Sequence, residues 1–180
     1  MKTKRKTVDD LLQATKTLYD QSNSDKLLDR LSDLPALEAM ENSAAANDVV
    51  RQLDKRKLHP IRPKRGEVYL AKITTNVGAE LNGQHLVVII QNNKSNLFAN
   101  KVNVVVIEGD GNKINPDYHI QLLSADMISG RLDKDPSRIV TSDILTIDKS
   151  RLKQRIGRIS DPKIKQLNAK LRKQLSLNNS

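Results

Sequence analysis

The sequence contains no cysteine and no tryptophan, and its only aromatic residues are three tyrosines and one phenylalanine. The absence of cysteine excludes disulfides and thiolate zinc sites and fits a reducing cytoplasm. So few aromatic rings argue against a nucleic-acid platform built from stacked side chains. No apolar run approaches the roughly 18 residues that a membrane span needs, and no apolar signal core follows the basic start MKTKRKTVDD. We therefore expect a soluble cytoplasmic protein with no membrane contact.

The formal net charge of +10 lies mainly at the two ends of the chain. Residues 149–180 carry ten basic side chains and one acidic one, whereas residues 66–148 carry seven basic and ten acidic ones. Such a distribution indicates either contact with a polyanion or a tail that only increases solubility. Composition alone leaves both interpretations open.

The first part of the chain, residues 1–58, reads as a helical extension. Thr7 followed by two aspartates is typical of a helix start, and a second helix begins near Ser24 with leucines on one face. Pro35 is expected to open a further turn, and residues 49–53 predict another short helix. We expect such an extension to pack on the main domain or on its own copy in a dimer. The Pro-rich and basic residues 59–65 predict a linker.

Residues 66–180 predict the main domain. Short β-branched runs, EVYLAKI, HLVVIIQN, KVNVVVIEG, DYHIQL and SRIVTSDILTI, alternate with loops rich in glycine, asparagine and serine. About five strands without helix-length spacing predict a small antiparallel barrel or curled sheet. A basic amphipathic helix starts at Asp161-Pro162 and ends the chain. The fold class is therefore α+β, with a helical extension before the barrel and a helix after it.

No motif for phosphate-loop, metal or nucleophile-elbow chemistry is present, and GDGNKIN at residues 109–115 lacks the acidic spacing of a calcium loop. We expect neither a metal nor a cofactor. The segments RGEVY (65–69), GAE (78–80), VIIQN (88–92) and ILTIDKSRL (144–152) do resemble, in order and spacing, the MazF/PemK toxins of bacterial toxin–antitoxin systems. The resemblance covers residues 62 to about 175.

This resemblance implies a small SH3-like, MazF/CcdB-like barrel that forms a homodimer. It also implies cleavage of single-stranded RNA without a metal, and restraint by an antitoxin whose disordered, often acidic tail blocks the RNA groove. The alignment places His85 where the family has its catalytic arginine, and Glu108 where the family has a catalytic threonine or serine.

A histidine and a glutamate can form an acid–base pair for RNA cleavage by the neighbouring 2′-hydroxyl. The hypothesis assigns Glu108 as the base for the 2′-OH and His85 as the acid for the leaving 5′-oxygen, giving a 2′,3′-cyclic phosphate. Glu80 in the GAEL loop is expected to orient a base or to hold His85. Cationic contacts to RNA are expected from a basic set: Arg62, Lys64, Arg65 and Lys113.

Two other readings stay open at this point. The first is a binding module that has lost catalysis and binds RNA, DNA or a regulatory protein. The second follows from the fold's other use, in gyrase-poisoning toxins. The remaining histidines, His59 and His119, are expected to be surface residues, and Ser142 and Asp143 to serve in a turn or cap.

Overall fold

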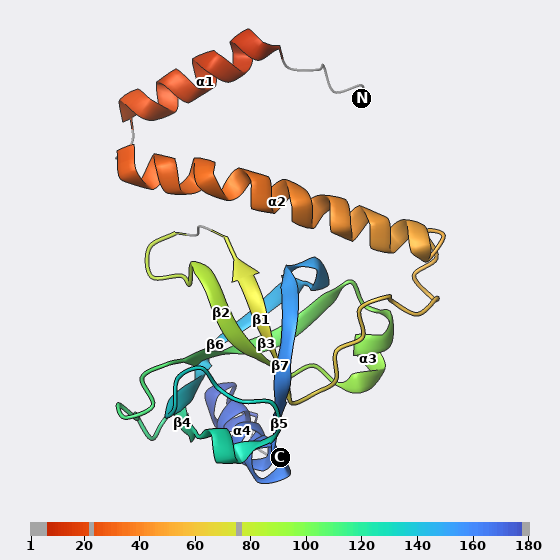
Figure 1. Ribbon diagram of the computed structural model, residues 1–180, viewed down its shortest axis with the longest axis vertical. Coiled ribbons are helices and arrows are strands. Elements are labelled where there is room, and N and C mark those ends of the chain that lie inside the picture. The colour runs from red at the N-terminus through yellow and green to blue at the C-terminus, as the bar shows by residue number, and fades with distance from the viewer. Residues whose placement is uncertain (1–6, 22–23, 75–76, 178–180) are drawn as a thin grey trace.

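The computed structural model describes residues 7–21, 24–74 and 77–177, which form two N-terminal helices, a seven-stranded sheet and a C-terminal helix (Figure 1). The helices are α1 (Val8–Gln21), α2 (Ser24–Val50), α3 (Asn93–Phe98) and α4 (Asp161–Gln174). The strands are β1 (Glu67–Ile73), β2 (Gly83–Ile89), β3 (Lys101–Glu108), β4 (His119–Leu122), β5 (Met127–Ser129), β6 (Ser137–Asp148) and β7 (Leu152–Ile159). Single 3-10 turns occur at Ser124–Asp126 and Lys149–Arg151.

All strand pairings among the described residues are antiparallel, in the spatial order β4-β6-β3-β2-β1-β7-β5. The sheet curls into a half-barrel, which confirms the predicted α+β class with a helix at each end of the sheet domain. The sheet has two strands more than expected, β5 and β7. The sequence did not predict them because β5 is only three residues long and β7 does not alternate simply between buried and exposed residues. The asparagine-rich loop after β2 also contains α3, whose N-cap Asn92 accepts a hydrogen bond from the Ser95 amide.

The two faces of the sheet carry separate apolar clusters. One cluster packs against α4 through Leu167 and Leu171, which are buried. Gly66, at φ +83°, leads into β1 beside Ile164 of α4, and a Cβ there would lie 2.7 Å from the isoleucine Cδ1. The second cluster lies on the opposite face and contains nine buried apolar residues: Ala71, Ile73, Val87, Ile89, Val102, Val104, Val106, Ile147 and Leu152.

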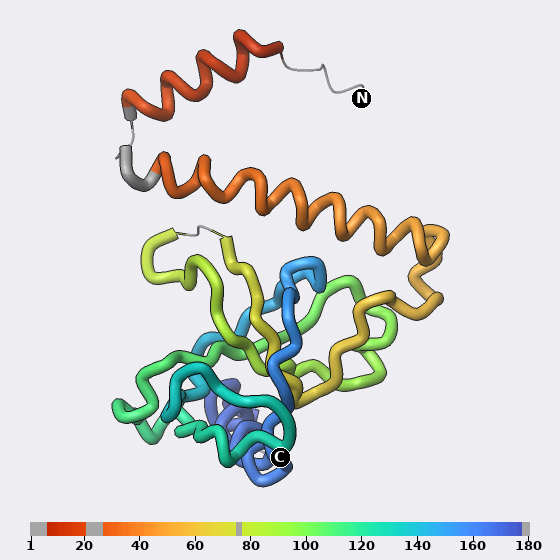
Figure 2. The backbone as a smooth tube through the Cα atoms, in the orientation of Figure 1, coloured from red at the N-terminus to blue at the C-terminus, as the bar shows by residue number. Residues whose placement is uncertain are grey.

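Helix α2 lies across the end of the sheet where β1 finishes and β2 begins (Figures 1 and 2). It is continuous through Pro35, so the predictions of a new turn opening at Pro35 and of a separate helix at residues 49–53 are wrong. Docking on both sides of the proline keeps the helix intact: Asp33 pairs with Lys72 of β1 at 2.8 Å, and Met40 is buried. At its C-terminal end, buried Arg51 donates to the Asn100 side chain. The side chains of α1, by contrast, are all exposed at residues 8–20.

Candidate active site

His85 and Glu108 lie beside each other on neighbouring strands. Leu86 of β2 is opposite Ile107 of β3, so one residue further along the antiparallel ladder His85 is opposite Glu108. Directly opposite side chains in such a ladder have Cβ atoms about 5 Å apart. Glu108 is in turn opposite Arg138 of β6. The three side chains therefore form one row across β2, β3 and β6, at the end of β3.

The Glu108 carboxylate is held by Arg138 through one of its two oxygens. Arg138 donates from Nε (2.8 Å) and from Nη2 (2.6 Å), both to Glu108 Oε2. A third donor of the same guanidinium, Nη1, reaches the Lys113 carbonyl at 2.6 Å. Glu108 Oε1 accepts no hydrogen bond from any described residue, and the side chain is partly exposed. Oε1 is therefore the oxygen that can accept a proton from a substrate.

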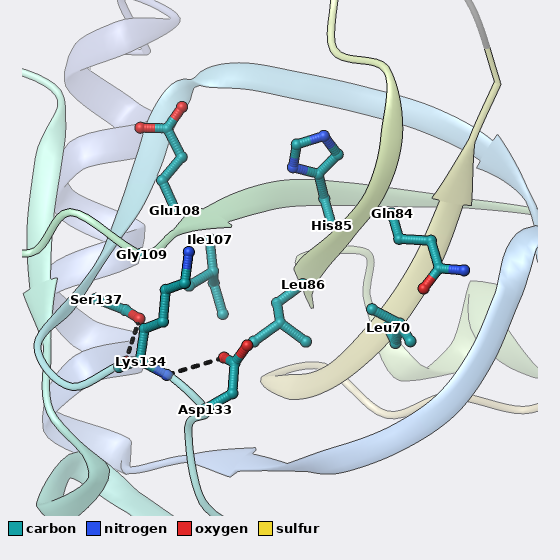
Figure 3. Close-up of a pocket in the computed structure, with 10 residues that line it drawn as sticks. All are labelled: Leu70, Gln84, His85, Leu86, Ile107, Glu108, Gly109, Asp133, Lys134 and Ser137. Atoms are coloured by element: carbon teal, nitrogen blue, oxygen red, sulfur yellow. Dashed lines mark hydrogen bonds between the residues drawn. The ribbon is translucent and has the colours of Figure 1, made fainter. Parts of the chain in front are cut away.

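His85 is half-buried near the start of β2, and its Nε2 lies 2.6 Å from the Asn82 carbonyl oxygen. A carbonyl can only accept a hydrogen bond, so Nε2 must carry the proton in this contact. Nδ1 is then the ring nitrogen left to exchange a proton with a substrate. Figure 3 shows the imidazole and the Glu108 carboxylate rising from the same side of the sheet.

The cavity drawn in Figure 3, of about 330 Å³, lies on the other side of these strands. Leu86 and Ile107 point toward Asp133 and Lys134 there, because successive side chains on a strand alternate between faces. His85 and Glu108 border this cavity but direct their side chains away from it. A substrate that contacts both side chains would therefore bind on the opposite face.

A second cavity, of about 560 Å³, lies between the β1–β2 loop and the middle of β6. It is lined by Ala79, Glu80, Leu81, Ser142, Asp143, Ile144 and Leu145. Leu81 and Leu145 pack on the cluster that contains Val87 and Val106, and these valines alternate in phase with His85 and Glu108. Glu80 thus lies on the same side of the sheet as His85 and Glu108. The Glu80 carboxylate accepts from the Val77 amide at 3.3 Å.

The basic residues predicted to contact RNA divide between two places. Arg62, Lys64 and Arg65 precede β1, whereas His85 is opposite Ala71. Ala71 is six positions after Arg65, and an extended chain of that length spans roughly 20 Å, so the structure does not bring this group together with the pair. Arg65 instead donates to Asn168 of α4 at 2.5 Å, and burial lowers its pKa.

Lys113 is nearer to the pair, since its carbonyl accepts from Arg138, but its own amine points outward. The side chain is 82% exposed and its ammonium pairs with Asp110 at 3.1 Å. Ser142 and Asp143, for which a turn or cap was expected, are part of strand β6.

Neither remaining histidine is a simple surface residue. His59 is buried at 3% exposure, and its Nδ1 accepts from the Ile61 amide at 3.0 Å. Burial, reinforced by the nearby Lys149 cation, lowers the pKa of His59. His119 is half-buried, and burial together with the Arg138 cation lowers its pKa. The surface prediction is wrong for His59 because the linker packs against α3, where the His59 backbone N–H donates a hydrogen bond to the Leu97 carbonyl.

Arg138 is the site residue that sequence reasoning missed. It stands in SRIVTSDILTI, where it reads as one polar position of an alternating strand. The sequence offered one signal, a polar position in an alternating strand together with an acid at the end of another strand. Arg138 and Glu108 are 30 residues apart, however, and the strand register that brings them together is not visible in the sequence. Within the described ranges, no three acidic or histidine side chains gather closely enough to hold a metal ion, and no helix is long and apolar enough to cross a membrane.

Comparison with known proteins gives a consistent result. Endoribonuclease MazF of Staphylococcus saprophyticus subsp. saprophyticus is 39% identical over 105 residues, which are 58% of this chain and 84% of that protein. A solved endoribonuclease from a mycobacterial species is 18% identical with a TM-score of 0.52, covering 66% of this chain and 96% of its own. A MazF structure from Deinococcus radiodurans is 12% identical with a TM-score of 0.50, covering 63% and 96%. These two likenesses show the fold.

The sequence family described as PemK-like, MazF-like toxin of type II toxin-antitoxin system matches residues 64–175. This match covers more than half of the chain and excludes both N-terminal helices. As the resemblance predicted, the chain belongs to the PemK-like, MazF-like toxin family of type II toxin–antitoxin systems.

Proposed function

We propose that this protein is the toxin of a toxin–antitoxin system and acts as an endoribonuclease that cleaves single-stranded RNA through the neighbouring 2′-hydroxyl. Family membership and the 39% identical endoribonuclease support the reaction class. The observation that carries the proposal is the pairing of His85 and Glu108 on one side of adjacent strands. Messenger RNA as substrate places the activity in the cytoplasm.

In this mechanism the two groups divide the proton transfers. Glu108 Oε1 takes the 2′-OH proton, the 2′-oxygen attacks the phosphorus, and the bond from phosphorus to the 5′-oxygen breaks as the imidazolium form of His85, with a proton on each ring nitrogen, donates its Nδ1 proton to that oxygen. The products are a 2′,3′-cyclic phosphate and a 5′-hydroxyl. Neither step calls on a metal. The cavity that contains Glu80 lies on the same face and offers room for an unpaired base beside the scissile phosphate.

The partners follow from the same family assignment. We propose an antitoxin with an acidic disordered tail, which the net charge of +10 would attract, and a homodimeric toxin. The division into an extension (1–58), a linker (59–65) and a barrel domain (66–180) is likewise part of the proposal. Growth arrest on inducible expression, relieved by coexpressing the antitoxin, tests the cellular role.

The chemical test uses purified protein and a 5′-labelled single-stranded RNA in excess EDTA. Wild type is expected to cut and to leave a cyclic phosphate, while a substrate with 2′-deoxy sugars stays intact. His85→Ala and Glu108→Gln are expected to lose at least about 100-fold in rate. Matched controls are Gln84→Ala, on the opposite face of β2, and Asp110→Asn, a partly exposed acid two residues after Glu108.

Intact RNA after incubation with folded wild type would refute the enzymatic proposal and would favour a binding module. Cleavage that survives both substitutions would keep the endoribonuclease and refute the assignment of the pair.

A further inference from the structure

The ion pair between Glu108 and Arg138 has a one-sided geometry. Two guanidinium nitrogens bond to Oε2, the third to a backbone carbonyl, and Oε1 is left without a partner among the described residues. Arg138 is 18% exposed and Glu108 is 32% exposed, so the carboxylate is the more accessible member of the pair. Arg138 thus bonds only to Oε2 and leaves Oε1 as the oxygen of the more accessible carboxylate that is open to a substrate.

We propose that Arg138 is a positioning residue that acts through Glu108, holding its carboxylate so that Oε1 faces the 2′-hydroxyl of the RNA. This inference rests on the proposed function and deepens it by naming the residue that orients the base. A glutamate side chain rotates about three bonds. Two charge-assisted hydrogen bonds from one planar guanidinium restrict that rotation. Arg138 itself donates a hydrogen bond to the Lys113 carbonyl, which fixes the guanidinium relative to the loop after β3.

Positioning of this kind has a large kinetic effect. A misplacement of about 1 Å in a reacting group can cost on the order of 100-fold in rate. Loss of Arg138 is therefore expected to lower kcat and to leave KM nearly unchanged, because the carboxylate remains present but is no longer directed. Arg138→Lys keeps the charge without the planar guanidinium and is expected to retain an intermediate rate.

The chain provides a matched control. Arg155 of β7 pairs with Glu67 of β1 from Nε at 2.8 Å, which is the same chemistry between two strands but outside the row of His85 and Glu108. Arg155→Gln removes a comparable ion pair and tests whether the kinetic effect comes from the loss of any cross-strand pair.

The experiment is a double-mutant cycle on RNA cleavage with Arg138→Gln, Glu108→Gln and both together. Arg138→Gln alone is expected to lower kcat by 10- to 100-fold with KM within about threefold. In the Glu108→Gln background the same change is expected to cost less than about threefold, since the residue that it positions is gone. Arg155→Gln is expected to stay within about twofold of wild type. Thermal unfolding verifies that each variant is folded.

Two kinetic outcomes would overturn the inference: an equal loss from Arg138→Gln in both backgrounds, or a loss that lies in KM alone. A measurement without RNA separates this inference from the proposed function. NMR couplings of the Glu108 side chain are expected to report one rotamer in wild type and averaging in Arg138→Gln. A rotamer distribution unchanged by the substitution refutes the positioning role, whether or not the protein cuts RNA.

Discussion

Lys149 gives the sharpest prediction about stability. Its side chain is completely buried, and Nζ donates to the Asn96 carbonyl at 2.7 Å. Burial, with a further contribution from the Arg51 cation, lowers the pKa of Lys149 from 10.5 to about 8. The folded protein therefore releases this proton more readily than the unfolded chain does.

The sign of the effect on stability follows from proton binding. Between pH 8 and the ordinary value of 10.5, the unfolded chain binds more protons at this site, so the free energy of unfolding increases with pH. One pKa unit corresponds to about 1.4 kcal/mol. The penalty of burying the charged amine is therefore about 3 kcal/mol at neutral pH and is mostly relieved by pH 10, a change of about 2 kcal/mol over that range.

The assay is urea unfolding of wild type and Lys149→Met at several pH values from 7 to 10. Wild type is expected to gain about 2 kcal/mol relative to the variant over this range. Lys94→Met, at an exposed lysine of α3, is the control and is expected to follow the wild-type curve. Parallel curves for wild type and Lys149→Met would refute the reasoning, because they would mean that this amine titrates alike in both states.

Further predictions concern the acid side of the pH range and the N-terminal helices. The pKa of His59 lies below its ordinary value of 6.5, so wild type is expected to lose stability as the pH falls through 6.5 toward 5, and His59→Gln to lose less, as measured by urea unfolding. Arg51→Ala is expected to cost about 3 kcal/mol, because acceptors at Lys55, Lys57 and Asn100 lose the three hydrogen bonds that the buried guanidinium donates. Arg56→Ala, at a side chain 91% exposed, is its control and is expected to cost under about 0.5 kcal/mol; equal costs would contradict the docking role of Arg51. Removal of residues 1–23 is expected to leave the melting temperature within about 2 °C, since the described side chains of α1 are exposed; a larger drop would show that α1 stabilises the fold.

The strands that were predicted correctly are those whose local chemistry and tertiary surroundings agree. β1 was predicted with the same bounds, residues 67–73, because β-branched and apolar residues are flanked there by a glycine and by turn-forming residues. Helix α4 was predicted from its Asp161-Pro162 start and its apolar spacing, and Leu167 and Leu171 are indeed its buried residues. Where the spacing of apolar residues, the secondary-structure propensity and the flanking turn-forming residues agree, the sequence is sufficient to predict the element.

The elements that were missed depend on contacts distant in sequence. β7 reads as a basic segment because its pairing with β1 contains register shifts, and a shifted strand does not alternate cleanly. Continuity of α2 through Pro35 depends on docking by Asp33 and Met40, and local propensity cannot show this. Lys149 shows the same limit within the resemblance itself, since the motif DKSRL contains it but says nothing of its burial.

The candidate site likewise contains two residues that the sequence marks and one that depends on contacts distant in sequence. His85 and Glu108 were found because the resemblance marks two positions, and the structure then shows that these positions are neighbours on one face. Arg138 has no such mark, since its importance arises only from the β3–β6 register. Position 85 has a histidine where the family has an arginine, so the guanidinium of the family is absent there. Arg138 places a guanidinium on β6, the strand next to Glu108. In the proposed mechanism, the residues at 85 and 108 therefore act together with Arg138 as one rearranged set, in which the guanidinium bonds to the proposed base and the proposed acid is an imidazole.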